Sequence, residues 1–433
     1  MQILNISKLR NGIGILKKQE NITENLTAEE NRKEITETME NAAAEKKPAR
    51  RPARKNTTAR KKKTDEAAGK EEKGGKAEKK ARAEKKTKSA SAETVKVKKS
   101  GKNKDGGKDL KQNEHSSKLK IIPLGGLEQI GMNITAFEYE DSIIVVDCGL
   151  SFPEDDMYGI DLVIPDITYL KDNIDKVKGF FITHGHEDHI GAIPYVLKEV
   201  NAPIYATKLT NGIIEHKLKE HNMLTKVKRK VVKYGQHINL GCFRVEFIKT
   251  NHSIQDAAAL AIYSPAGIVV HTGDFKVDYT PVFGDAIDLQ RFAEIGKKGV
   301  LALMSDSTNA ERKGFTQSER TVGITFDHIF AEHQNTRIII ATFASNVDRV
   351  QQIINSAVKY GRKVCVEGRS MVNIIEVAED LDYLKIPDGT LIETDEMKNY
   401  TPEQIVLITT GSQGESMAAL SRMAANLHRK VSI

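Results

Sequence analysis

The chain has 433 residues, with 66 Lys and Arg, 59 Asp and Glu, and a formal net charge of +7. It has no run of about 18 apolar residues, which excludes a predicted membrane span, and its first residues lack a secretory apolar core. Its three cysteines lie far apart, which argues against a disulfide scaffold or a zinc ribbon. We therefore expect a cytoplasmic protein of about two to four domains.

The positive charge is concentrated near the N-terminus. Residues 1–117 carry 32 basic and 18 acidic residues, a net charge of +14, so the remaining 34 basic and 41 acidic residues leave 118–433 with −7. Large apolar side chains are almost absent from 46–104, which predicts that 1–117 is a disordered extension. Such an extension either binds RNA through counterion release or serves only to solubilise the chain.

Ordered structure is predicted from residue 118 onward. Short apolar runs separated by turn residues predict strands, and the segment 178–200 predicts a strand, a His-rich loop and a helix. A further helix is predicted at 209–222. The predicted strands of this region are 119–126, 132–140, 142–149, 202–207, 227–234, 242–253, 258–264 and 267–275.

The pattern changes after Asp274. Apolar strands then alternate with amphipathic helices such as 346–361, which predicts a parallel sheet. We divide the ordered part into a mixed α/β domain at 118–305 and a parallel α/β module at 306–433. The last eight residues look like the start of another strand, so we expect the chain to stop within this module. The strands predicted in the alternating series are 299–308, 337–345, 362–368 and 404–412.

The strongest chemical signal is the run His184-Gly185-His186-Glu187-Asp188-His189, which directly follows a predicted strand. Loops at strand ends commonly carry functional groups. His184 and His186 can share one metal ion, while Asp188 and His189 can reach a second. The alternative is a surface loop that happens to be rich in His and Asp.

A two-metal site needs ligands from elsewhere in the chain. His252 and Asp274 also follow predicted strands, although each taken alone could cap a turn. Asp147 is predicted to orient a ligating His by accepting its other N–H. The predicted ligands are His184, His186, His252 and Asp274 for one ion, and Asp188, His189 and Asp274 for the other, which leaves the second ion one ligand short.

These motifs resemble the metallo-β-lactamase fold, and specifically the ribonuclease J family of its β-CASP nuclease branch. The resemblance runs from about Leu119 to the last residue and leaves out the Lys-rich extension. It rests on the segments LGGLEQIGMN, VDCGLSFPEDDMYGIDLVIPD, THGHEDHIGAIPY, HTGDFKVD, SDSTNAERKG, TTGSQGE and ALSRMA.

The resemblance implies a fold and an activity. It implies an αβ/βα sandwich with a β-CASP module, and a nuclease that cuts RNA internally and degrades it 5′→3′ from a monophosphorylated end. The expected roles are rRNA processing and mRNA decay. The implied cofactors are two Zn²⁺ ions, with Mn²⁺ as the alternative. The expected partners are RNA and either the ribosome or RNA-degradation proteins, and the full-length protein is expected to be a homodimer or homotetramer.

The resemblance also assigns residues in the β-CASP module. Asp306 matches the acidic residue of the first β-CASP motif and is predicted to be catalytic. Ser345 and Asn346, and Ser412 and Gln413, are expected in loops that open helices and bind RNA phosphate through free N–H groups; ordinary helix capping is the alternative. Two later His motifs of the family would fall beyond residue 433, and one of them would supply the missing ligand.

The mechanism expected is in-line attack on phosphorus by a metal-bridging hydroxide that Asp188 helps to orient, leaving a 5′-phosphate and a 3′-hydroxyl. Several alternatives remain open. One is a hydrolase of small thioesters or lactams on the same fold, and others are a di-iron redox protein and a DNA nuclease. A different class is a catalytically inactive protein that binds RNA or the ribosome through its basic extension.

Overall fold

The computed structural model describes residues 4–5, 117–154, 156–415, 418–431 and 433. The predicted disordered extension falls outside these residues, apart from residue 117 and the two-residue strand β1 (Leu4–Asn5), and its disorder stays a prediction. None of the helices in the described part is long and apolar enough to cross a membrane.

The first half of the described chain forms a six-stranded sheet in the order β2-β3-β4-β5-β6-β7. The strands β2 to β4 are antiparallel, and β4 to β7 run parallel. In β4, Ile143 and Val145 face one core cluster while Ile144 and Val146 face another, because alternate side chains point to opposite faces. The strands are β2 (Lys120–Gly125), β3 (Ile134–Tyr139), β4 (Ser142–Val146), β5 (Val177–Phe181), β6 (Ile204–Ala206) and β7 (Arg229–Val231).

A second, five-stranded sheet has the order β12-β11-β10-β9-β8. We predicted the strand within 299–308 as the first of the alternating β/α series, but β12 pairs in parallel with β11 and belongs to this sheet. The division between residues 305 and 306 stays a prediction. The strands are β8 (His237–Leu240), β9 (Phe243–Lys249), β10 (Ala258–Ser264), β11 (Gly267–His271) and β12 (Ala302–Met304).

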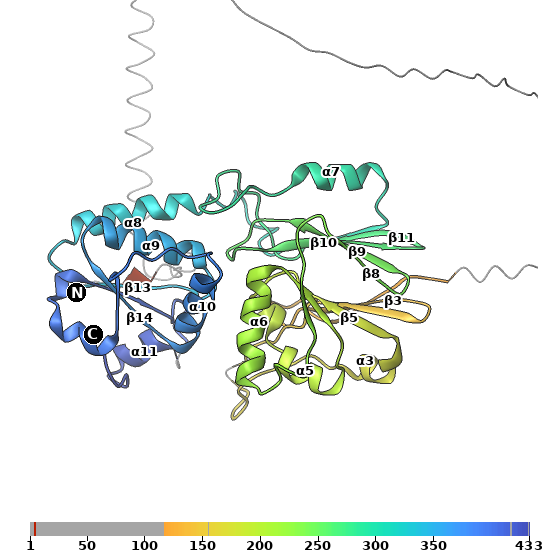
Figure 1. Cartoon of the computed structure of the whole chain (residues 1–433), viewed down its shortest axis with the longest axis horizontal. Coiled ribbons are helices and arrows are strands. Elements are labelled where there is room, and N and C mark those ends of the chain that lie inside the picture. The colour runs from red at the N-terminus through yellow and green to blue at the C-terminus, as the bar shows by residue number, and fades with distance from the viewer. Residues whose placement is uncertain (1–3, 6–116, 155, 416–417, 432) are drawn as a thin grey trace, which may run out of the picture. The chain divides into compact units, whose positions relative to one another are not determined.

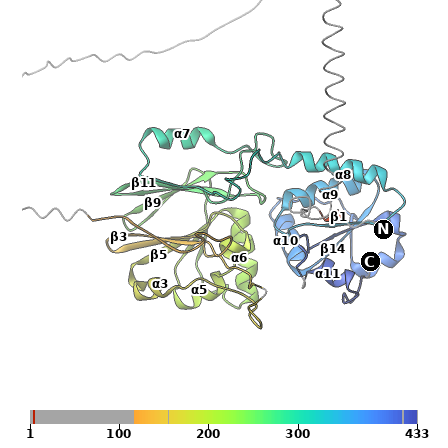
Figure 2. The ribbon, with the colours of Figure 1, turned by 180° about the vertical axis from the view of Figure 1, so that it is seen from behind.

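The two sheets pack face to face through an apolar core that includes Phe137, Phe181 and Phe247. Helices cover the outer faces, with α5 and α6 on one side and α7 on the other (Figures 1 and 2). The result is a four-layered sandwich, as the family resemblance implies. Its helices are α3 (Thr168–Asp172), α4 (Glu187–Ile190), α5 (Ile193–Glu199), α6 (Lys208–Glu220) and α7 (Leu289–Lys297), with a short 3₁₀ turn at Ile174–Lys176.

The third sheet has the order β1-β13-β16-β14-β15, and all its pairings are parallel. The predicted parallel sheet is therefore confirmed. Helices α8 and α9 lie on one face and α11 on the other (Figures 1 and 2). We call residues 306–433 the parallel module. Its elements are α8 (Arg320–Glu332), β13 (Ile338–Ala341), α9 (Val347–Lys359), β14 (Lys363–Glu367), α10 (Arg369–Asp380), β15 (Leu391–Ile392), β16 (Ile405–Thr409) and α11 (Ala419–Ala424), with 3₁₀ turns at Thr394–Asn399 and Pro402–Gln404.

Candidate metal centre

The His-rich loop joins β5 to α4 and is held close to the chain that follows β4. Cys148 N donates to His189 O over 2.8 Å, and Asn133 N donates to Asp188 O over 3.0 Å. A Cβ atom added to Gly149 would lie 1.6 Å from Asp188 O, so only glycine permits this approach. The backbone therefore holds Asp188 and His189, in the short helix α4, close to the chain after β4.

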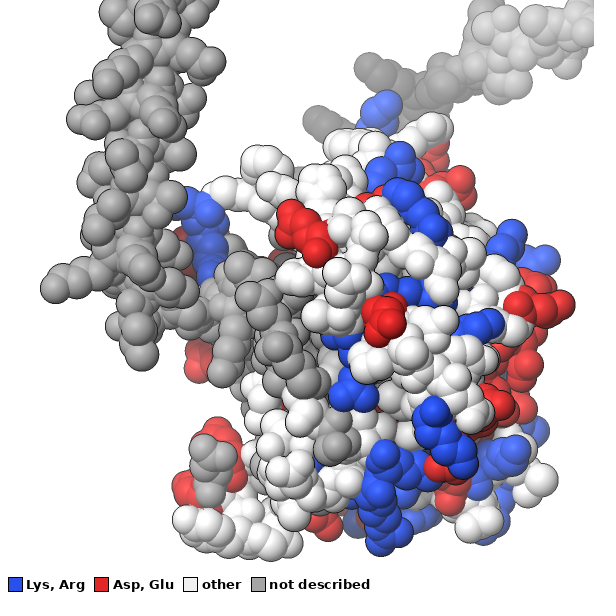
Figure 3. Space-filling model, turned by 90° about the vertical axis from the view of Figure 1, so that its left-hand side faces the viewer, with Lys and Arg blue, Asp and Glu red and all other residues white. Residues whose placement is uncertain are grey.

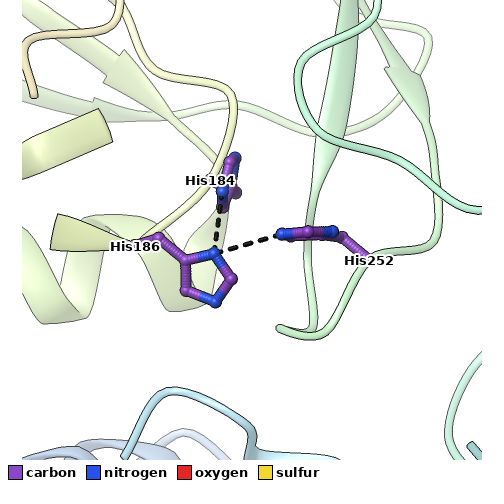
Figure 4. Close-up of side chains that lie close together, drawn as sticks. All are labelled: His184, His186 and His252. Carbon is purple, nitrogen blue, oxygen red and sulfur yellow. Dashed lines mark hydrogen bonds between the residues drawn. The ribbon is translucent and has the colours of Figure 1, made fainter. Parts of the chain in front are cut away.

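Three imidazoles converge at one point in front of this loop. His184 Nε2 lies 3.0 Å from His186 Nδ1, and His252 Nε2 lies 3.1 Å from the same atom (Figure 4). A tetrahedral ion bound at about 2.0–2.1 Å would place its ligand nitrogens about 3.3 Å apart. The spacing therefore fits a shared metal ion, and His252 reaches it from the loop after β9.

A second group of possible ligands consists of His184, His189 and Asp274. Asp274 Oδ1 lies 3.4 Å from His189 Nε2, and its Oδ2 lies 3.6 Å from His252 Nε2. The two oxygens of Asp274 therefore face the two groups, as expected of a bridging carboxylate. Asp188 belongs to neither group of three, although its Oδ2 lies 3.5 Å from His189 Nε2.

Asp147 lies behind the ligands, where it fixes the ring of His189. Its Oδ2 is 2.8 Å from His189 Nδ1, so the Nε2 of that ring points toward Asp274. Its Oδ1 accepts from the backbone N–H of Thr183 over 2.7 Å, and the Thr183 hydroxyl donates to both carboxylate oxygens. The carboxylate is 1% exposed. Such a partner orients a ligating imidazole and increases its basicity.

Burial sets the charge state of most of these imidazoles. Burial lowers the pKa of His184 well below its ordinary value, and it brings the pKa of His186 to about 3 and that of His252 to about 4. These three rings are neutral at pH 7 and their nitrogen lone pairs are available to a metal ion.

The buried His189 differs because carboxylates surround it. Burial opposes its protonation, but Asp147 and Asp274 outweigh burial and raise the pKa of His189. For the carboxyl group of Asp274, burial acts in the opposite direction and would raise the pKa, yet the neighbouring imidazoles, His189 first, lower it. A proton held between His189 and these carboxylates is what a metal cation would replace.

Asp306 lies outside both ligand groups. Its Oδ2 accepts from Phe275 N over 3.4 Å, and its Oδ1 accepts from Thr308 N over 2.8 Å. Its backbone N–H donates to the Thr272 hydroxyl over 3.0 Å. Asp306 therefore ties the turn after β12 to the turn that carries Asp274.

The predicted phosphate-binding residues lie in two loops of the parallel module. Asn346 is 2% exposed and caps α9, where its Oδ1 accepts from Arg349 N over 3.1 Å. Ser345 precedes it and is half-buried. In the other loop Ser412 is buried, and its hydroxyl has no hydrogen-bond partner among the described residues. The exposed Gln413 follows it.

The expectation that this second loop opens a helix is wrong. Helix α11 begins only at Ala419, with Ala418 as its N-cap residue. Five residues separate Gln413 from that helix start. The start of α11 nevertheless lies against this loop, because Ala419 N donates to Thr410 Oγ1 over 3.4 Å and Leu420 N donates to Thr410 O over 3.1 Å, so these two N–H groups are already engaged.

Sequence reasoning missed three polar side chains beside the ligands. Asn133 Nδ2 donates to Asp188 O over 3.2 Å and lies 3.1 Å from His189 Nε2. Thr183 joins Asp147 to His184, whose Nδ1 is 3.0 Å from the Thr183 hydroxyl. His271 accepts from Gly273 N over 3.1 Å, and burial lowers its pKa. All three lie within the motifs quoted above, but no spacing rule singles out any of them.

Two family models match the chain. Residues 131–312 match the metallo-β-lactamase superfamily, and residues 335–433 match the ribonuclease J β-CASP domain. The chain is a relative of ribonuclease J. Its fold is accordingly the metallo-β-lactamase sandwich with a β-CASP module, and its superfamily implies a metal cofactor. The two His/Asp groups supply nitrogen and oxygen donors that suit such a cofactor.

Individual members of the ribonuclease J family are similar over three-quarters of the chain. Ribonuclease J of Synechocystis sp. is 46% identical over 75% of this chain and 51% of its own length. Ribonuclease J 1 of Streptococcus pyogenes is 48% identical over 75% of this chain and 57% of its own length. Ribonuclease J2 of Bacillus subtilis is 41% identical over 74% of this chain and 58% of its own length. The chain thus spans about half the length of the curated relatives it matches.

The fold of the chain is also found among solved structures. One is a protein of unknown function from Enterococcus faecalis, which is 18% identical with a TM-score of 0.50. The match covers 67% of this chain and 76% of that one. At this identity the likeness concerns the fold alone.

Proposed function

We propose that the chain is a metal-dependent ribonuclease that cuts RNA internally and also degrades it 5′→3′ from a monophosphorylated end, in RNA maturation and decay. The observation that carries this proposal is the pair of adjacent ligand groups that share His184, with one oxygen of Asp274 near His189 and the other near His252. Two neighbouring ions are the usual arrangement for clamping a phosphodiester during in-line displacement. The family of the relatives supports RNA as the substrate.

The proposed cofactors are two Zn²⁺ ions, because imidazole nitrogens dominate the donor set; Mn²⁺ is the alternative that the carboxylates permit. His184, His186 and His252 would hold one ion, Asp188 and His189 the other, and Asp274 would serve both. Such ions, when bound, lower the pKa of water and polarise the phosphodiester. The ring of His189 keeps its orientation through Asp147.

Asp188 is the residue that we assign to the attacking water. Its carboxylate is 33% exposed, whereas His189 beside it is 2% exposed, so Asp188 can meet both solvent and the ligand cluster. There it would accept a proton from the water and keep the oxygen in line with phosphorus, leaving a 5′-phosphate and a 3′-hydroxyl. Asp306 would act indirectly, by holding the turn beside Asp274.

RNA phosphate would be bound by the strand-end loops of the parallel module. Ser412 is the candidate in one loop: its hydroxyl has no partner among the described residues, and because that hydroxyl is buried, a phosphate oxygen would reach it only after the loop moves. Gln413 is exposed beside it. Asn346 already caps α9, so we assign it, with Ser345, to shaping this loop around the RNA backbone.

The folded part has a negative charge balance, so attraction of RNA must be local or come from outside it. On the face shown in Figure 3, Lys and Arg are interspersed with Asp and Glu, and several basic side chains gather in its lower part. We propose that residues 1–117, with a net charge of +14, add long-range attraction. Deleting them should weaken RNA binding most at low salt and leave single-turnover cleavage nearly unchanged; a large loss of cleavage would contradict this role.

The decisive experiment compares the chain with its His184→Ala and Asp188→Ala variants. Zinc and manganese content is measured by mass spectrometry, and cleavage is measured on a 5′-monophosphorylated RNA, its 5′-hydroxyl counterpart and a thioester. We expect about two ions per chain, and RNA cleavage that both variants lose. Metal binding without RNA cleavage but with thioester hydrolysis would favour a small-molecule hydrolase. RNA binding with less than one ion and no cleavage would favour an inactive RNA-binding protein.

A further inference from the structure

The loop Thr250–Ala257 connects β9 to β10 and carries the possible ligand His252. Before that residue, the loop is anchored by Asn251, whose backbone O accepts from Lys276 N over 2.7 Å. The side chain of Asn251 accepts from Ile287 N over 2.7 Å and donates to Asp285 O over 3.1 Å. These contacts lie within the sandwich and hold the first half of the loop.

The second half of the loop makes a contact of a different kind. Gln255 is 7% exposed, and its Nε2 donates to Asp348 Oδ1 over 2.5 Å. Asp348 lies in the first turn of α9, two residues after the cap residue Asn346. A single side-chain pair therefore joins the loop of His252 to the start of the helix that the Ser345–Asn346 loop opens.

Asp256 makes a second connection to the parallel module. Its Oδ2 accepts from the hydroxyl of Tyr383, which follows α10, and from Leu209 N at the start of α6 over 3.1 Å. Its backbone O accepts from the Thr207 hydroxyl over 2.8 Å. Asp256 has a φ of +62°, a backbone conformation that residues other than glycine rarely adopt. The hydrogen bonds to Asp256 therefore stabilise a backbone conformation that is unfavourable by itself.

Neighbouring contacts strengthen the same junction. Lys208 Nζ donates to Leu381 O over 2.8 Å and stands 5.6 Å from the centre of the Tyr383 ring. A small cavity lies where these contacts meet. The amide oxygen of Gln255, Oε1, has no hydrogen-bond partner among the described residues. The cavity is lined in part by Gln255, Asp256, Lys276, Phe283, Asp348 and Tyr383.

We propose that Gln255 and Asp256 are positioning residues, which hold α9 and the segment after α10 in place beside the metal ligand His252. The distance along the chain from His252 to Gln255 is three residues, so a shift of the parallel module cannot leave the ligand loop unchanged. As a consequence, the strand-end loops of the parallel module would hold the RNA backbone at one fixed distance from the metal centre. This consequence rests on the ribonuclease activity proposed above.

A long substrate and a short one should respond differently to this positioning. An RNA strand contacts the module and the metal centre together, whereas bis(4-nitrophenyl) phosphate needs only the metal centre. Loosening the junction should therefore reduce the binding and turnover of RNA alone. Loss of a merely structural contact would instead lower metal content and both activities in parallel.

The test uses the whole chain and the double variant Gln255→Ala/Tyr383→Phe. The matched control is Tyr360→Phe, which removes a phenolic hydroxyl that bonds to Asp327 O within the parallel module. We expect the double variant to keep its metal content and its activity on bis(4-nitrophenyl) phosphate within twofold, while kcat/KM for RNA falls at least tenfold. The control should change none of the three. Equal losses on both substrates, or no loss on RNA, would overturn the proposal.

A measurement independent of activity separates this proposal from the proposed function. Hydrogen exchange of 347–352 and 381–384 is followed with and without Zn²⁺. We expect Zn²⁺ to slow exchange at least threefold in the wild type and in Tyr360→Phe, but not in the double variant. If the wild type cleaves no RNA yet shows this transmitted protection, the ribonuclease activity fails and the positioning role stands. If Zn²⁺ binds and protects neither segment in the wild type, the positioning role fails.

Discussion

The polar groups of the metal centre and those of the parallel module's strand-end loops are held in different ways. At the metal centre, the side chains orient one another, as Thr183, Asp147 and His189 do in a buried series of contacts. In the parallel module, Asn346 is engaged by its own helix, while the Ser412 hydroxyl has no partner among the described residues. The candidate metal centre is therefore preorganised, whereas the proposed RNA contacts of the loops would be completed only when the substrate binds.

The largest effect is expected from Asp274→Ala, because this carboxylate faces both ligand groups. Metal content should fall for both ions, and RNA cleavage should fall by more than about 100-fold, the upper range reached by the outer partners of metal ligands. Metal analysis and a cleavage assay test this together. Retention of both ions would show that Asp274 is not shared and would weaken the contrast between the two regions.

A smaller effect is expected from Asp147→Asn, which keeps the size of the side chain but removes its charge. Without the carboxylate, the ring of His189 loses the partner that sets its orientation, and metal affinity should fall about 10–100-fold. Competition with a chelator measures this loss. Thr183→Ser serves as the control, because its hydroxyl can still donate to Asp147; an equal loss in that variant would point to packing instead.

The contact of Gln255 with Asp348, between the sandwich and the parallel module, should make the free energy of unfolding depend on pH. Burial, with Glu319 and Asp278 adding to it, raises the pKa of Asp348 to about 6, against the lowering effects of Gln255 and Lys276. Because the folded state holds this proton more tightly than the unfolded chain, stability is lost as the pH rises from about 4 to above 6. Over this pH range the raised pKa of Asp348 corresponds to a loss of about 2–3 kcal/mol in the free energy of unfolding.

Asp348→Asn tests this assignment, since asparagine still accepts from Gln255 but does not titrate. Urea unfolding from pH 4 to pH 8 should show the decline in the wild type and a flatter curve in the variant. Asp327→Asn is the comparison, because hydrogen bonds from Lys359 and Ser356 lower the pKa of that carboxyl. Identical pH profiles for Asp348→Asn and the wild type would remove Asp348 as the source.

The smallest effects distinguish the two loops of the parallel module. Asn346→Ala removes a helix cap and should lower the free energy of unfolding by about 1 kcal/mol. Ser412→Ala removes a buried hydroxyl without a described partner, so it should leave stability unchanged or raise it by up to about 1 kcal/mol, while RNA affinity falls. Thermal unfolding measures the stability of the two variants, and RNA titration measures their affinity. A stability loss in Ser412→Ala would show that this hydroxyl has a structural role.

Sequence reasoning was most successful where the pattern is local. The six-residue His-rich run and the apolar strand before it lie next to each other in the chain, and alternating apolar residues predicted most strands and the parallel sheet. It failed at the loop of Ser412, because a glycine-rich turn after a strand resembles a helix start whether or not a helix follows directly. It also placed β12 in the wrong series, since an apolar strand does not reveal its partner.

The sequence by itself therefore determined the elements, the ligand types and the family to which the motifs point. Only the tertiary structure decided which side chains meet. Asp147 lies 42 residues from His189, Gln255 lies 93 from Asp348, and Asp256 lies 127 from Tyr383. Such pairs have no period or spacing in the chain, because their proximity arises from the stacking of whole sheets and helices. For this reason the candidate metal ligands could be named in advance, whereas the residues that connect the parallel module to them could not.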